Sequence, residues 1–245
     1  MAHLLREGFD TANSTQVTRT LAHFVSDAGR ALRNGKHFVT PSGNRIRIAP
    51  VDRIQIAAGP THVHIDQTTL PGVFLVAGAP FSDHRGAFAR LFCEHELAPV
   101  LGSRRIVQVN HSRTAVPGAV RGMHYQLPPH AEMKLVRCLK GRVWDVAVDL
   151  RSESPTFLRW HAEELTTENA RMLVIPEGFA HGFQVLEAQS ELLYLHTAFY
   201  NPAAEGGVSC NDPRLAIGWP LPVTDLSERD KGHAPIEPGY IGIAL

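Results

Sequence analysis

The sequence predicts an all-β fold for most of the chain, because short apolar segments alternate with turn-forming residues throughout its second part. From residue 65 onward these segments are separated by Gly, Pro, Asn and Asp, which is typical of a β-sandwich or barrel. Neither the strand–helix alternation of a parallel sheet nor a glycine-rich phosphate loop after a strand occurs in the sequence. We expect strands at 73–77, 106–109, 135–139, 143–148, 173–175 and 192–196.

Residues 1–64 differ from the rest of the chain in their pattern of apolar and turn-forming residues, and they are interpreted as an N-terminal extension. Residues 14–34 predict a helix, since apolar side chains recur there with the helical period, and Gly35 is placed to end it. Residues 37–49 then indicate a hairpin around a Pro-Ser-Gly-Asn turn. We therefore expect a helix-plus-hairpin extension, followed by a barrel domain over 65–245.

The composition excludes several classes of partner. The 24 basic and 24 acidic residues balance, so no net field draws the chain to nucleic acid or to a membrane surface. No apolar run approaches the roughly 18 residues that cross a bilayer. The three cysteines have neither metal-binding spacing nor the even number of a disulfide framework. Together with an N-terminus unlike a signal peptide, these features favour a cytoplasmic protein that binds neither nucleic acid nor membrane.

Two histidine-containing segments point to a particular kind of barrel. Arg121-Gly-Met-His-Tyr-Gln126 and Pro176-Glu-Gly-Phe-Ala-His181 resemble the two motifs of a cupin, a double-stranded β-helix or jelly-roll barrel. Metal-binding cupins have a second histidine where this chain has Gln126, and a carboxylate about where Lys134 falls. Zinc and iron sites generally require about three or four His, Cys or carboxylate ligands. We therefore expect a cupin barrel that uses no metal and no other cofactor.

His124 and Lys134 are predicted to face each other across a hairpin. His124 and Gln126 share one face of a strand, because side chains alternate with period two, and Lys134 begins the returning strand. A neighbouring cation keeps an imidazole unprotonated, which suits a general base, and an ammonium can stabilise an oxyanion. The alternative is a polar hairpin with a hydrogen-bonded histidine and a solvated lysine, and these residues alone do not decide between the two.

Other candidate residues are ambiguous when each is taken singly. Tyr194 lies in an apolar strand, where a tyrosine usually packs in the core with its hydroxyl satisfied. Asp230 would ordinarily be a surface acid on a helical turn. Arg85 and Arg121 can hold phosphate bidentately, although lone arginines are most often surface residues. His181 fits a structural hydrogen bond and a polar group of the site equally well.

Taken together, these segments resemble the dTDP-4-dehydrorhamnose 3,5-epimerase family, the metal-independent cupin epimerases of nucleotide-linked 4-keto-6-deoxy sugars. The resemblance covers about residues 65–235. Its further segments follow in unbroken order and include Asp83-x-Arg-Gly, Gln108-Val-Asn-His-Ser, Lys134-Leu-Val-Arg-Cys, Ser154-Pro-Thr-Phe, Asn211-Asp-Pro and Leu226-Ser-x-x-Asp230. Each is weak alone, whereas the combination is highly specific. It implies an isomerase that acts as a homodimer.

The resemblance implies a role for each matching residue. His124 matches the base that removes the proton α to the C4 ketone, and Asp230 matches the aspartate that orients this base. Lys134 matches the lysine that stabilises the enolate oxygen, and Tyr194 matches the acid that returns a proton to the opposite face. The substrate-binding matches are Arg85 and Arg121 for the diphosphate, and Gln108, Asn110 and His181 for the pocket wall.

Two departures from the family pattern leave the substrate open. Where family members commonly carry a glutamate that holds thymine, this chain has Arg90, and a guanidinium can only donate hydrogen bonds. We therefore expect Arg90 to contact a different base, or the base to be held differently. The ordinary family also lacks the extension over 1–64. Three alternatives stay open: a C3-only or C5-only epimerase of a modified sugar, a catalytically silent cupin that binds a nucleotide sugar, and a metal-dependent cupin.

Overall fold

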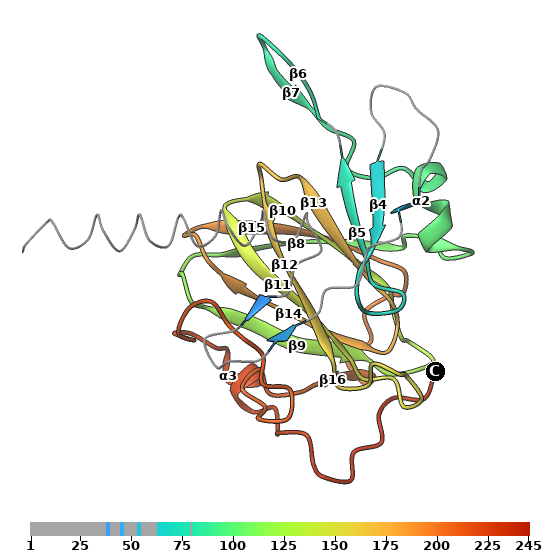
Figure 1. Cartoon of the computed structure of the whole chain (residues 1–245), viewed down its shortest axis with the longest axis vertical. Coiled ribbons are helices and arrows are strands. Elements are labelled where there is room, and N and C mark those ends of the chain that lie inside the picture. Colours follow the sequence, from blue (N-terminus) through green and yellow to red (C-terminus); the bar gives the residue numbers. More distant parts are fainter. Residues whose placement is uncertain (1–37, 40–44, 47–52, 55–62, 79) are drawn as a thin grey trace, which may run out of the picture. The chain divides into compact units, whose positions relative to one another are not determined.

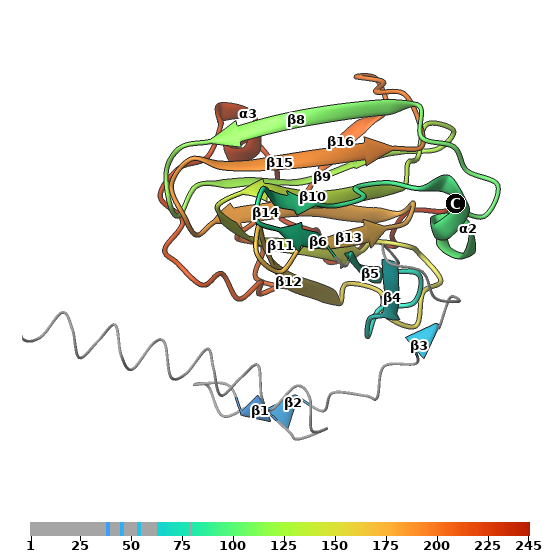
Figure 2. The same ribbon diagram turned by 90° about the horizontal axis from the view of Figure 1, so that it is seen from above.

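The computed structural model describes residues 38–39, 45–46, 53–54, 63–78 and 80–245. The chain divides into two compact units, Met1–Pro50 and Val51–Leu245. In the first unit, β1 (Phe38–Val39) pairs antiparallel with β2 (Arg45–Ile46), within the segment where the sequence predicts a hairpin. The helix predicted at 14–34 lies outside the described residues. The second unit carries the barrel (Figure 1, Figure 2).

One sheet of the second unit contains seven described strands in the order β3-β4-β5-β13-β10-β15-β8. The neighbours all pair antiparallel. Its members are β3 (Arg53–Ile54), β4 (Val63–Gln67), β5 (Phe74–Gly78), β8 (Gln108–Thr114), β10 (Lys134–Lys140), β13 (Arg171–Ile175) and β15 (Ser190–His196). The strand predicted at 106–109 begins later and is longer, because residues 108–114 pair with β15 although alternate side chains are polar.

The facing sheet contains five described strands in the antiparallel order β12-β11-β14-β9-β16. They are β9 (Val120–Gln126), β11 (Arg142–Asp149), β12 (Trp160–Thr166), β14 (Phe179–Val185) and β16 (Glu205–Gly207). β9 and β14 approach closely at Gly122, where an added Cβ would lie 2.5 Å from the Cα of Gly182. Gly122 also has φ 138°, so glycine is required at this crossing. The two packed sheets confirm the all-β jelly-roll barrel that the sequence predicts.

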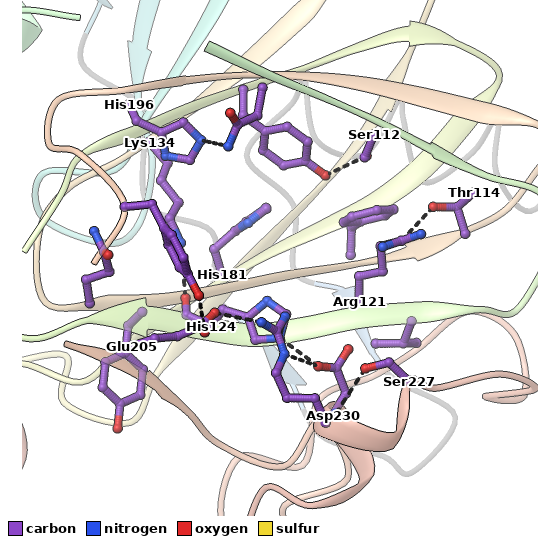
Figure 3. Close-up of a pocket in the computed structure, with 18 of the residues that line it drawn as sticks. Ser112, Thr114, Arg121, His124, Lys134, His181, His196, Glu205, Ser227 and Asp230 are labelled. Carbon is purple, nitrogen blue, oxygen red and sulfur yellow. Dashed lines mark hydrogen bonds and ion pairs between the residues drawn. The ribbon is translucent and has the colours of Figure 1, made fainter. Parts of the chain in front are cut away.

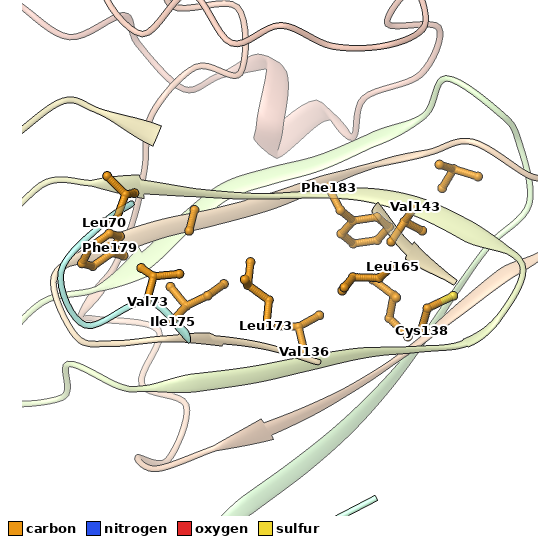
Figure 4. Packing of buried hydrophobic residues seen from close by; sticks show 13 residues of the cluster. Leu70, Val73, Val136, Cys138, Val143, Leu165, Leu173, Ile175, Phe179 and Phe183 are labelled. Carbon is orange, nitrogen blue, oxygen red and sulfur yellow. The ribbon is translucent and has the colours of Figure 1, made fainter. Parts of the chain in front are cut away.

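The main apolar core fills the space between the two sheets (Figure 4). Alternate residues of each strand point inward, so Val136 and Leu173 of one sheet meet Phe183 of the other. Each such fully buried side chain contributes about 1.5–3 kcal/mol through removal of apolar surface from water. The remaining labelled members are Leu70, Val73, Cys138, Val143, Leu165, Ile175 and Phe179.

Helix α2 (Glu94–Leu101) covers the outer face of the seven-stranded sheet. Its buried Leu97, Val100 and Leu101 belong to one cluster with Ile65 of β4 and Leu135 of β10. The sequence did not predict this helix, because it is short and Pro99 interrupts its pattern. None of the helices in the described part of the chain is long and apolar enough to span a membrane.

Two small elements stand beside the barrel. β6 (Phe81–Asp83) and β7 (Gly86–Phe88) form a hairpin that extends from its body (Figure 1), and Phe81 and Phe88 are 56% and 67% exposed. Helix α3 (Glu228–Lys231) lies against β9. The Gly122 N–H of β9 donates a hydrogen bond to the Asp230 carboxylate of α3. This contact connects the C-terminal part of the chain to the strand that carries His124.

Candidate active site

A cavity of about 910 Å³ opens between the two sheets, next to α3. Its polar side chains come from β8, β10 and β15 on one side and from β9, β14 and α3 on the other (Figure 3). Eight of the ten residues singled out by the sequence line it: Gln108, Asn110, Arg121, His124, Lys134, His181, Tyr194 and Asp230.

His124 and Asp230 form a histidine–carboxylate pair at one side of this cavity. The Nε2 of His124 lies 2.8 Å from Oδ1 of Asp230, whose side chain is 2% exposed. Burial alone would raise the pKa of Asp230, but the hydrogen bond and charge of His124, with further hydrogen bonds from Gly122 and Ser227, lower it to about 2. Asp230 is therefore ionised and holds the imidazole in one orientation.

The local sequence explains how Asp230 reaches a strand 106 residues away. Ser227 has extended backbone and caps α3, since its hydroxyl accepts a hydrogen bond from the Asp230 N–H at 3.1 Å. This cap starts the helical turn just before Asp230. The Asp230 carboxylate then projects toward β9, where Gly122 donates to its second oxygen at 3.3 Å.

Lys134 lies in the same cavity, close to the strand that carries His124. Its Nζ donates to the His124 carbonyl oxygen at 3.3 Å and lies 3.3 Å from Oε1 of Glu132. Its side chain is nearly buried, so its charge is little screened by water. The predicted hairpin between His124 and Lys134 is wrong, because β9 and β10 lie in different sheets. The two residues are nevertheless close, since the Lys134 side chain reaches the His124 main chain from the facing sheet.

Glu132 and His196 form a second ion-pair group that the sequence analysis missed. The Nδ1 of His196 lies 2.7 Å from Oε2 of Glu132, and its Nε2 lies 3.3 Å from Nδ2 of Asn110. Burial opposes ionisation of Glu132, but the hydrogen bond from His196 and the charge of Lys134 lower its pKa below the ordinary value. Nothing local marks this pair, because its members are 64 residues apart.

Tyr194 lies between two histidine rings on the wall formed by β15. Its ring centroid is 6.2 Å from that of His181, edge to face, and 6.2 Å from that of His196, stacked. Its hydroxyl lies 3.0 Å from Oγ of Ser112. Burial raises the pKa of Tyr194, so the hydroxyl keeps its proton and is able to donate it.

His181 pairs with Asp145 deep between the sheets. Its Nε2 lies 2.8 Å from Oδ1 of Asp145, a fully buried residue of β11. The sequence left a structural and a site interpretation of His181 open. The geometry contains both features, since His181 is hydrogen bonded in the interior and also lines the cavity beside Tyr194.

Two of the predicted substrate-binding residues, Arg121 and Gln108, are held by hydrogen bonds at the cavity wall. Arg121 donates from Nε to Oγ1 of Thr114 at 2.8 Å, and Oε1 of Gln108 accepts from the Tyr200 N–H at 3.0 Å, both at the cavity wall. Gln126, at the cupin ligand position, is buried and donates its amide to the His130 carbonyl. Its side chain therefore supports the loop that precedes β10.

The structure does not bring Arg85 and Arg90 to this cavity. Arg85 lies in the β6–β7 hairpin, where its guanidinium pairs with Asp83 at 2.6 Å and is 77% exposed. Arg90 precedes α2 and pairs with the buried Glu96 at 2.5 Å. Both arginines lie in the connection between β5 and α2, and no described residue of this connection lines the cavity.

The fold and this cavity define a cupin whose pocket holds acid–base groups. Comparison with known proteins identifies the kind more closely. The model of the family described as dTDP-4-dehydrorhamnose 3,5-epimerase matches residues 67–237. The chain therefore belongs to this family and is an isomerase of the epimerase class, as the sequence motifs predict.

Individual relatives agree with this assignment. The dTDP-4-dehydrorhamnose 3,5-epimerase of Shigella flexneri is 42% identical over 169 residues, which cover 69% of this chain and 93% of that protein. The enzyme of the same name from Pseudomonas aeruginosa is 46% identical over 164 residues, 66% of this chain and 90% of the relative. A crystal structure of the Legionella pneumophila epimerase in complex with dTDP-4-keto-L-rhamnose has a TM-score of 0.70 and 38% identity, covering 75% and 100% of the two chains.

Proposed function

We propose that this protein epimerises a nucleotide-diphospho-4-keto-6-deoxyhexose at one or both carbons next to the ketone. The observation that carries the proposal is the placement of opposed acid–base groups in one cavity. His124 with Asp230 comes from the β9 side, and Tyr194 comes from β15 of the facing sheet. The Legionella pneumophila relative, described in complex with dTDP-4-keto-L-rhamnose, supports the substrate class.

The first chemical step is proton removal by His124. A ketone acidifies the neighbouring C–H bond, so a positioned imidazole suffices as the base. The C–H electron pair becomes a C=C bond to the carbonyl carbon, and the carbonyl oxygen takes the negative charge of the enolate. His124 becomes an imidazolium. Asp230, which is ionised and buried beside it, stabilises this positive charge.

The second step returns a proton to the opposite face of the same carbon. Lys134 stabilises the enolate oxygen, since its ammonium is close to the His124 main chain and little exposed. Tyr194 then donates its hydroxyl proton, and the enolate collapses to the ketone with inverted configuration. The Ser112 hydroxyl, 3.0 Å from the Tyr194 oxygen, then relays a replacement proton from water to the tyrosinate.

The exposed β6–β7 hairpin supports a homodimer. Phe81 and Phe88 are directly paired on the hairpin and are more than half exposed. Adjacent exposed aromatic side chains of this kind usually mark an interaction surface. In a homodimer the hairpin of one copy would be covered by the other, and Arg85 would then meet the diphosphate of a neighbouring site. The substrate is a small molecule, and we place the enzyme in the cytoplasm.

Product analysis with a panel of 4-keto-6-deoxy sugar nucleotides tests the function. The proposal predicts inversion at C3, at C5 or at both, read from proton coupling constants in the product. Inversion at a single carbon would establish the C3-only or C5-only alternative. Tight binding of a sugar nucleotide with no inversion and no exchange of ring protons would establish the binding-only alternative and refute the proposal.

A further inference from the structure

His233 lies just after α3 and packs against the pair formed by His124 and Asp230. Its ring meets the His124 ring edge to face, with centroids 5.7 Å apart and planes inclined at 70°. Its Nε2 lies 3.9 Å from Oδ1 of Asp230, and it is buried without a hydrogen-bond partner among the described residues. A buried polar atom without a partner costs free energy, so a ligand that binds this nitrogen stabilises the protein.

We infer that His124, Asp230 and His233 form a binding site for Zn²⁺ that inhibits the enzyme. One ring nitrogen of each histidine and a carboxylate oxygen of Asp230 lie within 4.8 Å of one another. Two histidines and one carboxylate, with a fourth position left to water, are a ligand set that zinc commonly takes in proteins. Within the part of the chain that the structure describes, no other cluster of His, Cys and acidic residues has this geometry.

The distances suit zinc after small side-chain movements. Bonds of about 2.0–2.1 Å in a tetrahedron place donor atoms about 3.4 Å apart. The Asp230 oxygen is 2.8 Å from the His124 nitrogen and 3.9 Å from the His233 nitrogen. Each separation therefore changes by about half an ångström, and rotation of the His233 ring closes the remaining gap between the imidazoles.

This site is distinct from the position at which cupins bind metal. There the chain has Gln126, whose amide is engaged by backbone groups, and Lys134, whose ammonium repels a cation. His233 lies in the segment that follows α3 and contacts the His124 ring from there. The zinc site thus shares His124 with the cavity and takes its other ligands from the C-terminal segment.

Arg229 opposes the ion and limits its affinity. Its Nη2 lies 3.1 Å from Nε2 of His124, and its Nε lies 3.5 Å from Oδ1 of Asp230. The Arg229 side chain is 54% exposed and pairs with Glu205, so its guanidinium can swing toward solvent when an ion arrives. Removal of its charge should therefore strengthen zinc binding, the opposite of what removal of His233 should do.

The functional consequence rests on the proposed function. An ion bound here uses the Nε2 lone pair of His124, so the neutral imidazole carries its one proton on Nδ1 and has no free lone pair left to accept the α-proton. Asp230 then orients the ion instead of the imidazole, so the base loses its partner. Added Zn²⁺ should therefore reduce turnover reversibly, and a chelator should restore turnover instead of removing it.

Calorimetric titration of ZnCl₂ into chelator-treated, full-length protein tests the site directly. The wild type should bind one ion per chain at this site. His233→Ala should weaken that binding by about 10- to 100-fold, and Arg229→Gln should strengthen it by about threefold or more. His95→Ala, which removes an exposed histidine of α2, is the matched control and should leave the affinity unchanged. Cobalt(II) should give a visible tetrahedral absorption band that His233→Ala abolishes.

Equal zinc affinity in the wild type and in His233→Ala would overturn the site, and so would weaker binding by Arg229→Gln. If His233→Ala does not fold, His233→Gln with unchanged circular dichroism replaces it and decides in the same way. Zinc binding at this site with undiminished turnover would overturn the inhibitory claim. If no 4-keto sugar nucleotide is turned over at all, the proposed function fails, and the calorimetry still decides whether the metal site exists.

Discussion

Two of the histidine–carboxylate pairs at the cavity have the same spacing and different surroundings. His124 with Asp230 and His181 with Asp145 each place a ring nitrogen 2.8 Å from a carboxylate oxygen. His124 and His181 are even register partners on β9 and β14. The His124 side chain is 21% exposed, however, whereas that of His181 is 7% exposed.

The carboxylates differ as much as the histidines. Asp230 lies at the end of a helical turn, where Gly122 donates to one oxygen and Arg229 lies near the other. Asp145 lies between the sheets, and its second oxygen has no partner among the described residues. A base must reach substrate and exchange its proton with water, so the outer pair suits catalysis. The inner pair suits a fixed pocket floor that holds the ring beside Tyr194.

Replacement of His124 should have the largest effect on activity. His124→Asn should lower kcat/KM by about 10⁴-fold, because the amide has no basic nitrogen to take the α-proton. The folded state should persist, since the side chain is partly exposed and Asp230 retains the Gly122 N–H. Steady-state kinetics and a thermal melt measure the two effects. A loss of less than tenfold would remove His124 from its role.

Replacement of His181 should lower the stability of the fold much more than replacement of His124 does. His181→Ala leaves the Asp145 carboxylate buried without its partner, which costs about 3–5 kcal/mol in the free energy of unfolding. His124→Ala, the matched variant of the outer pair, should cost about 1 kcal/mol or less. Urea unfolding of both variants provides the comparison. Equal destabilisation would show that the two pairs do not differ in the way their burial indicates.

Asp230→Asn should separate orientation from basicity. The amide is nearly the same size and can still contact the His124 ring, but it lacks the charge that favours the imidazolium. Turnover should fall by about 10²-fold or more, with little change in KM. Full activity in this variant would mean that His124 acts without its carboxylate.

Acid should weaken the outer pair in a defined window. The pKa of Asp230 is lowered from an ordinary 3.8 to about 2, so its contribution to stability is complete above about pH 4 and is lost as the pH falls toward 2. We expect the difference in unfolding free energy between wild type and Asp230→Asn to shrink by about 1–2 kcal/mol over this range. A difference that stays constant between pH 6 and pH 2.5 would contradict the shift.

Local patterns in the sequence predicted the barrel and one part of the site. Strands β5, β10, β11, β13 and β15 were predictable because short apolar segments alternate with turn-forming residues. Lys134 does lie near His124, but it reaches the His124 main chain from the facing sheet and not across the predicted hairpin. β8 was misplaced at its start, since side chains that face a polar cavity do not show an apolar signature. Helix α2 was missed because Pro99 and its short length hide the helical period.

Contacts between distant segments were beyond local reasoning. Asp230 was identified by resemblance, because nothing near residue 230 indicates a partner on β9. Asp145 with His181 joins two strands, and Glu132 with His196 joins the loop before β10 to β15, so both pairings depend on how the sheets are assembled. Resemblance also suggested Arg85 and Arg90 as substrate-binding residues, and these two assignments stay predictions. In this chain both have acidic partners outside the cavity.

Deuterium incorporation from D₂O is the most direct test of the central claim that His124 removes the proton and Tyr194 returns it. In the wild type, deuterium should enter the sugar carbons that are inverted. Tyr194→Phe should still incorporate deuterium through His124 while inversion fails, and His124→Asn should do neither. Exchange at the wild-type rate in His124→Asn, or equal loss of exchange and inversion in Tyr194→Phe, would contradict the account.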